Sequence, residues 1–155
     1  MAKKLALIAS KGSLDWAYPP FILASTAAAL DYEVQIFFTF YGLTLLKKDI
    51  SDLKVSPLGN PAMPMPVPMP NLAQMLPGME SMATIMMKQK IASKGVASIE
   101  TLREACLESG VKLIACQMTA DLFDFKPDDF IEDIEFGGAA TFFEFAGASD
   151  VNLFI

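Results

Sequence analysis

The chain contains 155 residues, of which 53% are hydrophobic and 19% are charged, so we expect one compact domain over residues 1–155 and exclude extensive disorder. The formal net charge of −6 argues against a nucleic-acid partner, because contact with phosphates requires a basic surface. The lack of histidine excludes imidazole-based catalysis. The sequence contains no metal-ligand cluster or cofactor motif. Two cysteines are too few for a disulfide framework and fit a reducing, cytoplasmic compartment.

The first part of the chain alternates strand and helix patterns. Leu5–Ala9 is a continuous apolar run, too short for a signal peptide, and predicts a buried strand. A proline pair suits a first helical turn and predicts a helix over residues 19–30. Glu33–Thr39 is β-branched and aromatic and predicts a second strand, after which Gly42 is a break and Leu43–Lys48 a short helix. Two strands joined by a crossover of this length form a parallel pair.

Residues 54–79 form a Met/Pro-rich insert. Seven of the ten prolines lie there, and eight of the ten methionines lie within residues 63–87. Prolines at this density exclude a central strand or a membrane-spanning helix, and no membrane contact is expected. A helical pattern resumes over Asn71–Lys90 with a break at Pro77. Because methionine adapts to irregular surfaces, the insert predicts a homo-oligomer interface, with a lid over a pocket as one alternative and a contact with another partner or, against the expectation above, with a membrane as the other.

The remaining elements complete an α/β pattern. Ser98–Gly110 has an N-cap serine and a terminal glycine and predicts a helix. Val111–Ala115 predicts a third buried strand, Met118–Phe125 a short helical or irregular stretch, Ala139–Ala146 a helix, and Val151–Ile155 a last strand. This alternation predicts a three-layer α/β sandwich around a mainly parallel sheet of about five strands.

Charge is distributed unevenly along the chain. Residues 1–99 carry nine lysines and six acidic residues, a net of +3, whereas residues 100–155 carry three basic and twelve acidic residues, a net of −9. A solvated acidic surface is the simpler interpretation, and a docking face for a basic partner is the alternative.

Candidate chemistry lies where the strands end, because ligands of open parallel sheets bind at the carboxyl ends of the strands. Cys116 follows the third strand and is the one strong nucleophile in the loops expected there. Backbone N–H groups at a strand-to-helix turn would favour its thiolate. The alternative is that Cys116 is a small buried hydrophobic residue. The candidate substrate-binding or supporting residues are Lys11, Gly12, Ser13, Tyr41, Gly42, Gln117 and Thr119.

Cys106 is expected to be structural, because it lies on the apolar stripe of the 98–110 helix. Helix and strand rises place it and Cys116 at heights that differ by about 10 Å, beyond the Cα separation of about 7 Å that a disulfide allows. An internal disulfide between the two is therefore not expected.

Several segments resemble a known family. Residues 10–20, 36–43, 110–119 and 152–155 resemble the DsrE/DsrF-like family, in particular its DsrE2-type branch, sometimes labelled peroxiredoxin-like. The resemblance extends over nearly the whole chain, and Ala115-Cys116-Gln117-Met118-Thr119 is its most specific element. It implies an α/β fold, assembly into oligomers and, for several members, sulfur trafficking through a cysteine that carries a persulfide or thiosulfonate. That cysteine corresponds to Cys116 here, and Cys106 to a second cysteine common in the branch.

Three functions follow as hypotheses. The first is a sulfur carrier or sulfurtransferase that accepts sulfane sulfur on Cys116 and passes it to a partner thiol. The second is a non-catalytic oligomeric binding or scaffold protein in which Cys116 only packs. The third is a thiol oxidoreductase, which requires a resolving thiol. Expected partners are sulfur donor or acceptor proteins and further copies of the chain, no cofactor is expected, and a carrier is favoured over a multi-turnover enzyme.

Overall fold

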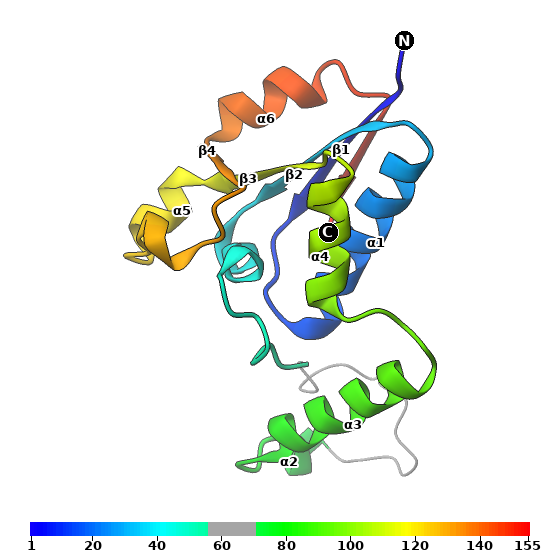
Figure 1. Cartoon of the computed structure of the whole chain (residues 1–155). Coiled ribbons are helices and arrows are strands. Elements are labelled where there is room, and N and C mark those ends of the chain that lie inside the picture. Colours follow the sequence, from blue (N-terminus) through cyan, green and yellow to red (C-terminus); the bar gives the residue numbers. More distant parts are fainter. Residues whose placement is uncertain (56–70) are drawn as a thin grey trace.

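The computed structural model describes residues 1–55 and 71–155. Most of the Met/Pro-rich insert, residues 56–70, lies outside the described residues, and so does any test of its role. Helices and strands alternate along the chain (Figure 1). The elements are β1 (Lys4–Ala9), α1 (Leu14–Ala29), β2 (Glu33–Phe38), the 3-10 helix η1 (Phe40–Leu46), α2 (Asn71–Gln74), α3 (Met79–Ser93), α4 (Ile99–Glu108), β3 (Lys112–Cys116), α5 (Gln117–Leu122), the 3-10 helix η2 (Pro127–Asp129), β4 (Glu135–Gly137), α6 (Ala139–Ala146) and β5 (Val151–Phe154).

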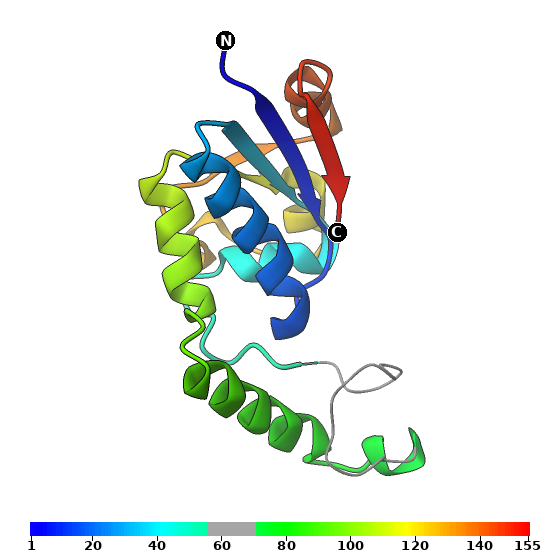
Figure 2. The same cartoon turned by 90° about the vertical axis from the view of Figure 1, so that its right-hand side faces the viewer.

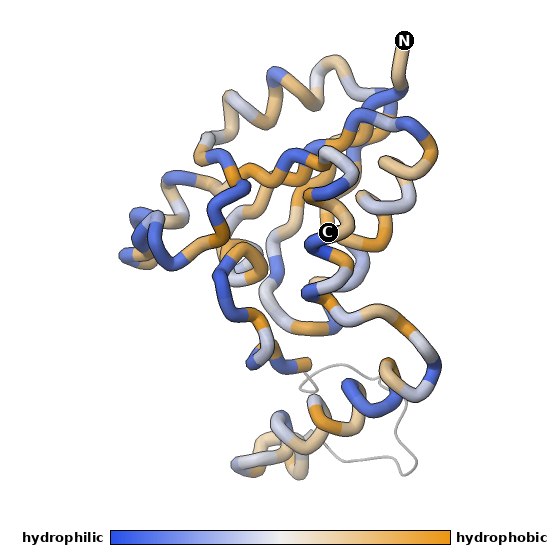
Figure 3. Tube along the Cα trace, in the orientation of Figure 1, coloured by the Kyte–Doolittle hydropathy of each residue, from blue (hydrophilic) through white to orange (hydrophobic). Residues whose placement is uncertain are grey.

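The five strands form one sheet in the order β4-β3-β2-β1-β5, and every pair is parallel. This confirms the predicted fold class. The three central strands are mostly apolar because both of their faces are covered, although β2 includes the buried Gln35 (Figure 3). The edge strand β4 has only three residues, Glu135–Gly137, and so short a segment has no readable period from which a strand could be predicted.

Two neighbouring phenylalanines of β2 define the layers. Successive side chains of a strand point to opposite faces of the sheet. The ring of Phe38 lies 5.9 Å from the ring of Phe21 in α1, whereas the ring of Phe37 lies 5.7 Å from that of Phe142 in α6. Helices α1 and α4 therefore cover one face and α6 the other (Figures 1 and 2).

Helix α3 extends away from the sheet in both views (Figures 1 and 2). Only Ala83 and Thr84 of this helix are buried. The Thr84 hydroxyl accepts a hydrogen bond from the Val55 N–H at 3.0 Å, and Lys88 donates to the Ser51 carbonyl at 2.5 Å. Within residues 1–55 and 71–155, no helix has the length and hydropathy that crossing a bilayer requires.

Two helix boundaries differ from the sequence expectation. Helix α1 begins at Leu14 rather than at the proline pair, since the Leu14 N–H donates to the Lys54 carbonyl at 2.8 Å, a contact distant in sequence. The prolines therefore lie inside the helix, where each leaves one carbonyl of the preceding turn without a helical donor. Instead of a helix over Leu43–Lys48, η1 begins at Phe40, and Lys47 forms an antiparallel bridge with Phe130.

Candidate functional site

Cys116 is the last residue of β3 and the residue from which α5 starts. Its register partner in β4 is Gly137. The side chain is only 4% exposed and makes no capping hydrogen bond to α5. The structure thus places Cys116 at the carboxyl edge of the sheet, as expected, but largely covered.

Thr119 connects the loop after β2 to the helix after Cys116. Its side chain is fully buried, and its hydroxyl oxygen accepts a hydrogen bond from the Phe40 N–H at 3.1 Å. The same oxygen lies 3.4 Å from the Thr39 hydroxyl. Phe40 has a φ of 49°, a left-handed conformation that non-glycine residues adopt at a cost, and this hydrogen bond helps to hold it. Thr119 therefore fixes the position of the residue 39–41 turn beside the start of α5.

Gly12 and Gly42 are required by the close approach of the first two loops. A Cβ on Gly12 would overlap the Tyr41 carbonyl and the Thr44 hydroxyl, and a Cβ on Gly42 would overlap the Ala9 carbonyl. Both glycines therefore allow the backbones of the two loops to come into contact at this edge of the sheet.

The loop after β1 and the start of η1 form a shallow cavity of about 430 Å³. The Lys11 ammonium lies 3.3 Å from the centroid of the Trp16 ring, a cation–π contact, and does not reach toward Cys116. Strand β2 separates β1 from β3, so the two loops lie about 10 Å apart at the usual strand spacing. Cys116 does not line this cavity. The lining residues are Lys11, Gly12, Ser13, Trp16, Tyr41 and Thr44. Trp16 and Thr44 are not among the candidate residues named from the sequence.

Aromatic rings cover the space between this cavity and α5. Tyr41 is 64% exposed and stacks on Phe123, with ring centroids 5.9 Å apart and planes 15° apart. Phe123 also meets Phe40, edge to face at 6.3 Å. The signal for this contact was present in the sequence as the aromatic pair that follows α5, but only the fold brings it onto Tyr41. Gln117 is exposed and donates to the Asp121 carboxylate at 2.8 Å, along its own helix.

Cys106 has a different environment. Its thiol is fully buried between α4 and α1 and donates to the Phe21 carbonyl at 3.4 Å. Burial raises the pKa of Cys106 to about 11, although a backbone hydrogen bond at Ser25 lowers it in part. Both cysteines are free thiols. Cys106 therefore behaves as a core residue that stays protonated at neutral pH.

The arrangement can support thiol chemistry at one position. Among the described residues, no group of three or more Cys, Asp or Glu side chains is placed to hold a metal ion. Cys116 is the thiol at the loop edge of the sheet, and it is followed in α5 by the exposed Met118 and the buried Thr119.

Comparisons with known proteins agree with this fold. The model of the DsrE/DsrF/DrsH-like family matches residues 1–154. The chain is 68% identical to the sulfur carrier protein DsrE2 of Allochromatium vinosum, over 99% of this chain and 98% of that protein. It is 32% identical to the uncharacterized protein YrkE of Bacillus subtilis, over 99% and 97% of the two chains. The crystal structure of the ychN protein from E. coli shares the fold with a TM-score of 0.58 at 11% identity, over 99% of each chain. The chain therefore belongs to the DsrE/DsrF/DrsH-like family.

Proposed function

We propose that this protein is a sulfur carrier in which Cys116 accepts a sulfane sulfur and passes it to a thiol of a partner protein. The observation that carries the proposal is the position of Cys116 at the carboxyl edge of the parallel sheet, where ligands of such folds bind. The 68% identity with a protein named a sulfur carrier supports the same role. Cys106, which is fully buried, is assigned to the core.

Loading is a redox-neutral exchange at sulfur. The Cys116 thiolate attacks the outer sulfur of a donor persulfide, a new S–S bond forms, the donor's S–S bond breaks, and the donor leaves as a thiolate. The proton on the outer sulfur stays with it, so the product is a Cys116 persulfide. With tetrathionate as donor, the thiolate attacks one of the two inner sulfurs, the central S–S bond breaks, thiosulfate leaves, and the product is a Cys116 thiosulfonate. Neither reaction needs a metal, a cofactor or an imidazole base once the thiol is ionised.

Delivery is the same exchange in the other direction. A partner thiolate attacks the outer sulfur of the Cys116 persulfide, and Cys116 leaves as a thiolate. Because Cys116 is 4% exposed, an attacking thiol can reach it only when the side chains that cover it move aside. A thiol covered in this way limits loss of its sulfur to solvent and favours transfer within a docked complex. We assign a carrier role rather than a multi-turnover enzyme on this ground.

We also propose that the chain forms a homo-oligomer in the cytoplasm. Helices α2 and α3 expose a group of large apolar side chains, and so do α6 and β5. Contiguous apolar surface of this kind marks contacts with other protein surfaces. Light scattering coupled to size exclusion would test the assembly. The residues are Leu72 in α2, Met75 and Leu76 in the turn between the two helices, Met82, Ile85 and Met86 in α3, Phe143 in α6, and Val151, Leu153 and Phe154 in β5.

Intact-mass spectrometry after brief treatment with polysulfide or tetrathionate tests the carrier role. We expect a single adduct that reductant reverses, on the wild type and on Cys106→Ser but not on Cys116→Ser. Cys106→Ser is the matched control because it removes the other thiol and keeps the site.

Other outcomes identify the competing functions. If no variant takes up sulfur, Cys116 only packs, and the protein is an oligomeric binding or scaffold protein. If peroxide instead produces an internal disulfide, the protein is a thiol oxidoreductase. The burial of Cys106 and its raised pKa disfavour this last outcome, because a resolving thiol must ionise and be reached.

A further inference from the structure

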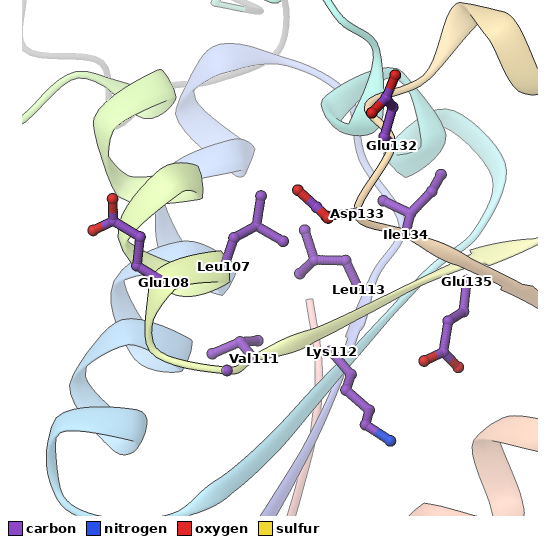
Figure 4. Close-up of a pocket in the computed structure, with 10 residues that line it drawn as sticks. Leu107, Glu108, Val111, Lys112, Leu113, Glu132, Asp133, Ile134 and Glu135 are labelled. Carbon is purple, nitrogen blue, oxygen red and sulfur yellow. The ribbon is translucent and has the colours of Figure 1, made fainter.

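A groove with a volume of about 560 Å³ lies at the edge of the sheet where β3 and β4 begin (Figure 4). The end of α4, the turn into β3 and the segment that leads into β4 form its walls. The side chains of Leu107, Leu113 and Ile134 gather at its centre (Figure 4). Val111 completes this apolar floor. The volume is in the range, about 300–1,000 Å³, of cavities that hold a ligand or a set of partner side chains.

Four carboxylates surround the apolar floor: Glu108, Glu132, Asp133 and Glu135. All four residues are exposed. In the part of the chain that the structure describes, the one salt bridge joins Lys4 to Glu33, so none of the four carboxylates has an ion-pair partner. Lys112 is the single cationic residue that lines the groove. Like charges held together repel, and a bound cationic group would relieve that repulsion.

We propose that this groove docks a basic, amphipathic segment of a partner protein. Its apolar side chains would cover Leu107 and Ile134, the half-buried residues of the floor, and its Lys or Arg side chains would meet the surrounding carboxylates. Both parts of the lining are needed for this assignment. A bare cation would leave the apolar floor exposed, and an uncharged apolar segment would leave the carboxylates unpaired.

Charge also decides between a different protein and a second copy of the chain. Each copy carries a net charge of −6 and four carboxylates line the groove, so a basic partner is attracted to the groove and to the acidic half of the chain more strongly than a second copy is. The docked segment therefore belongs to a different, basic protein.

The groove and Cys116 are at opposite ends of β3. Lys112 lines the groove and Cys116 ends the strand, a separation of about 13 Å at the usual rise of a strand. A partner anchored in the groove would leave the loops around Cys116 uncovered. Docking at the groove does not depend on the sulfur chemistry and stands whether or not Cys116 carries sulfur.

Two charge-matched triple variants test the proposal. The groove variant combines Glu132→Gln, Asp133→Asn and Glu135→Gln. The control variant combines Asp52→Asn, Glu80→Gln and Glu144→Gln, exposed residues outside the groove that give the same change in net charge. The probe is a short fluorescein-labelled peptide of Lys and Leu in an amphipathic pattern, and its binding is followed by fluorescence anisotropy. Ile134→Ser removes part of the apolar floor without a change in charge.

We expect the groove variant to bind the peptide about tenfold more weakly than the wild type, and the control variant to stay within about twofold. Ile134→Ser should weaken binding most at high salt, where the charged contacts are screened. Amide shifts in a nitrogen-15 spectrum should concentrate in residues 107–113 and 132–135. Five results would each overturn the proposal. In the binding assay these are an equal loss of affinity in the two triple variants, equal binding of a peptide of Glu and Leu, and no binding of the Lys/Leu peptide at low salt. The other two are amide shifts outside these residues and occupation of the groove by a second copy.

Discussion

Replacing Thr119 with valine tests whether one buried hydroxyl holds the turn beside Cys116. Valine has nearly the shape of threonine, so the change removes the acceptor of the Phe40 N–H, 3.1 Å away, and the contact with the Thr39 hydroxyl at 3.4 Å. The lost hydrogen bond and the donor left without a partner together cost about 2 kcal/mol of unfolding free energy. For a chain of this length that loss lowers the melting temperature by about 4–8 °C.

The same substitution has a functional readout. Without the hydrogen bond, the left-handed conformation of Phe40 loses support, and the 39–41 turn, which follows β2 beside the end of β3, moves more freely. Iodoacetamide should then modify Cys116 faster than in the wild type. Urea unfolding and the alkylation rate are measured on Thr119→Val and on Thr26→Val, a control at an exposed helical position. A loss of stability below about 0.5 kcal/mol, or equal loss in the two variants, would refute the reasoning.

Three further predictions follow from the packing. Gly42→Ala should lower the unfolding free energy by more than about 2 kcal/mol, since its Cβ would overlap the Ala9 carbonyl, whereas Gly138→Ala, with open space around it, should be near neutral in the same urea titration. The pKa of Cys106 is about 11 in the folded protein, above its ordinary value of 9.0. The unfolding free energy is therefore unaffected by this thiol below pH 9 and falls by about 3 kcal/mol as the pH rises to 11. This alkaline loss should be smaller in Cys106→Ala. Arg103→Met should cost about 2–4 kcal/mol in thermal unfolding, because this buried guanidinium donates to backbone carbonyls at the end of η1.

The central strands were predictable because their burial is recorded in the sequence. A strand covered on both faces is a continuous run of apolar residues, as in Leu5–Ala9 and Leu113–Ala115. The elements that the sequence did not predict depend on contacts between residues distant in sequence. The start of α1 depends on the bond from the Leu14 N–H to Lys54, and β4 depends on pairing with β3, since Glu135–Gly137 has no strand pattern of its own.

The position of Cys116 was predictable from topology, but its surroundings were not. Any residue that ends a central parallel strand lies at the carboxyl edge, and this follows from the order of elements. The direction of each side chain depends on packing. Lys11 lies over Trp16 instead of beside the thiol, and Tyr41 stacks on Phe123, a residue far along the chain.

Transfer between two copies of the protein measures the carrier role most directly. Wild-type protein loaded with polysulfide and freed of excess reagent is mixed with nitrogen-15-labelled wild type, Cys106→Ser or Cys116→Ser, and intact masses are followed with time. We predict that sulfane sulfur leaves the loaded protein and appears on labelled wild type and Cys106→Ser but not on labelled Cys116→Ser. Sulfur that never leaves the loaded protein, or that appears equally on labelled Cys116→Ser, would contradict the assignment of Cys116 as the carrying thiol.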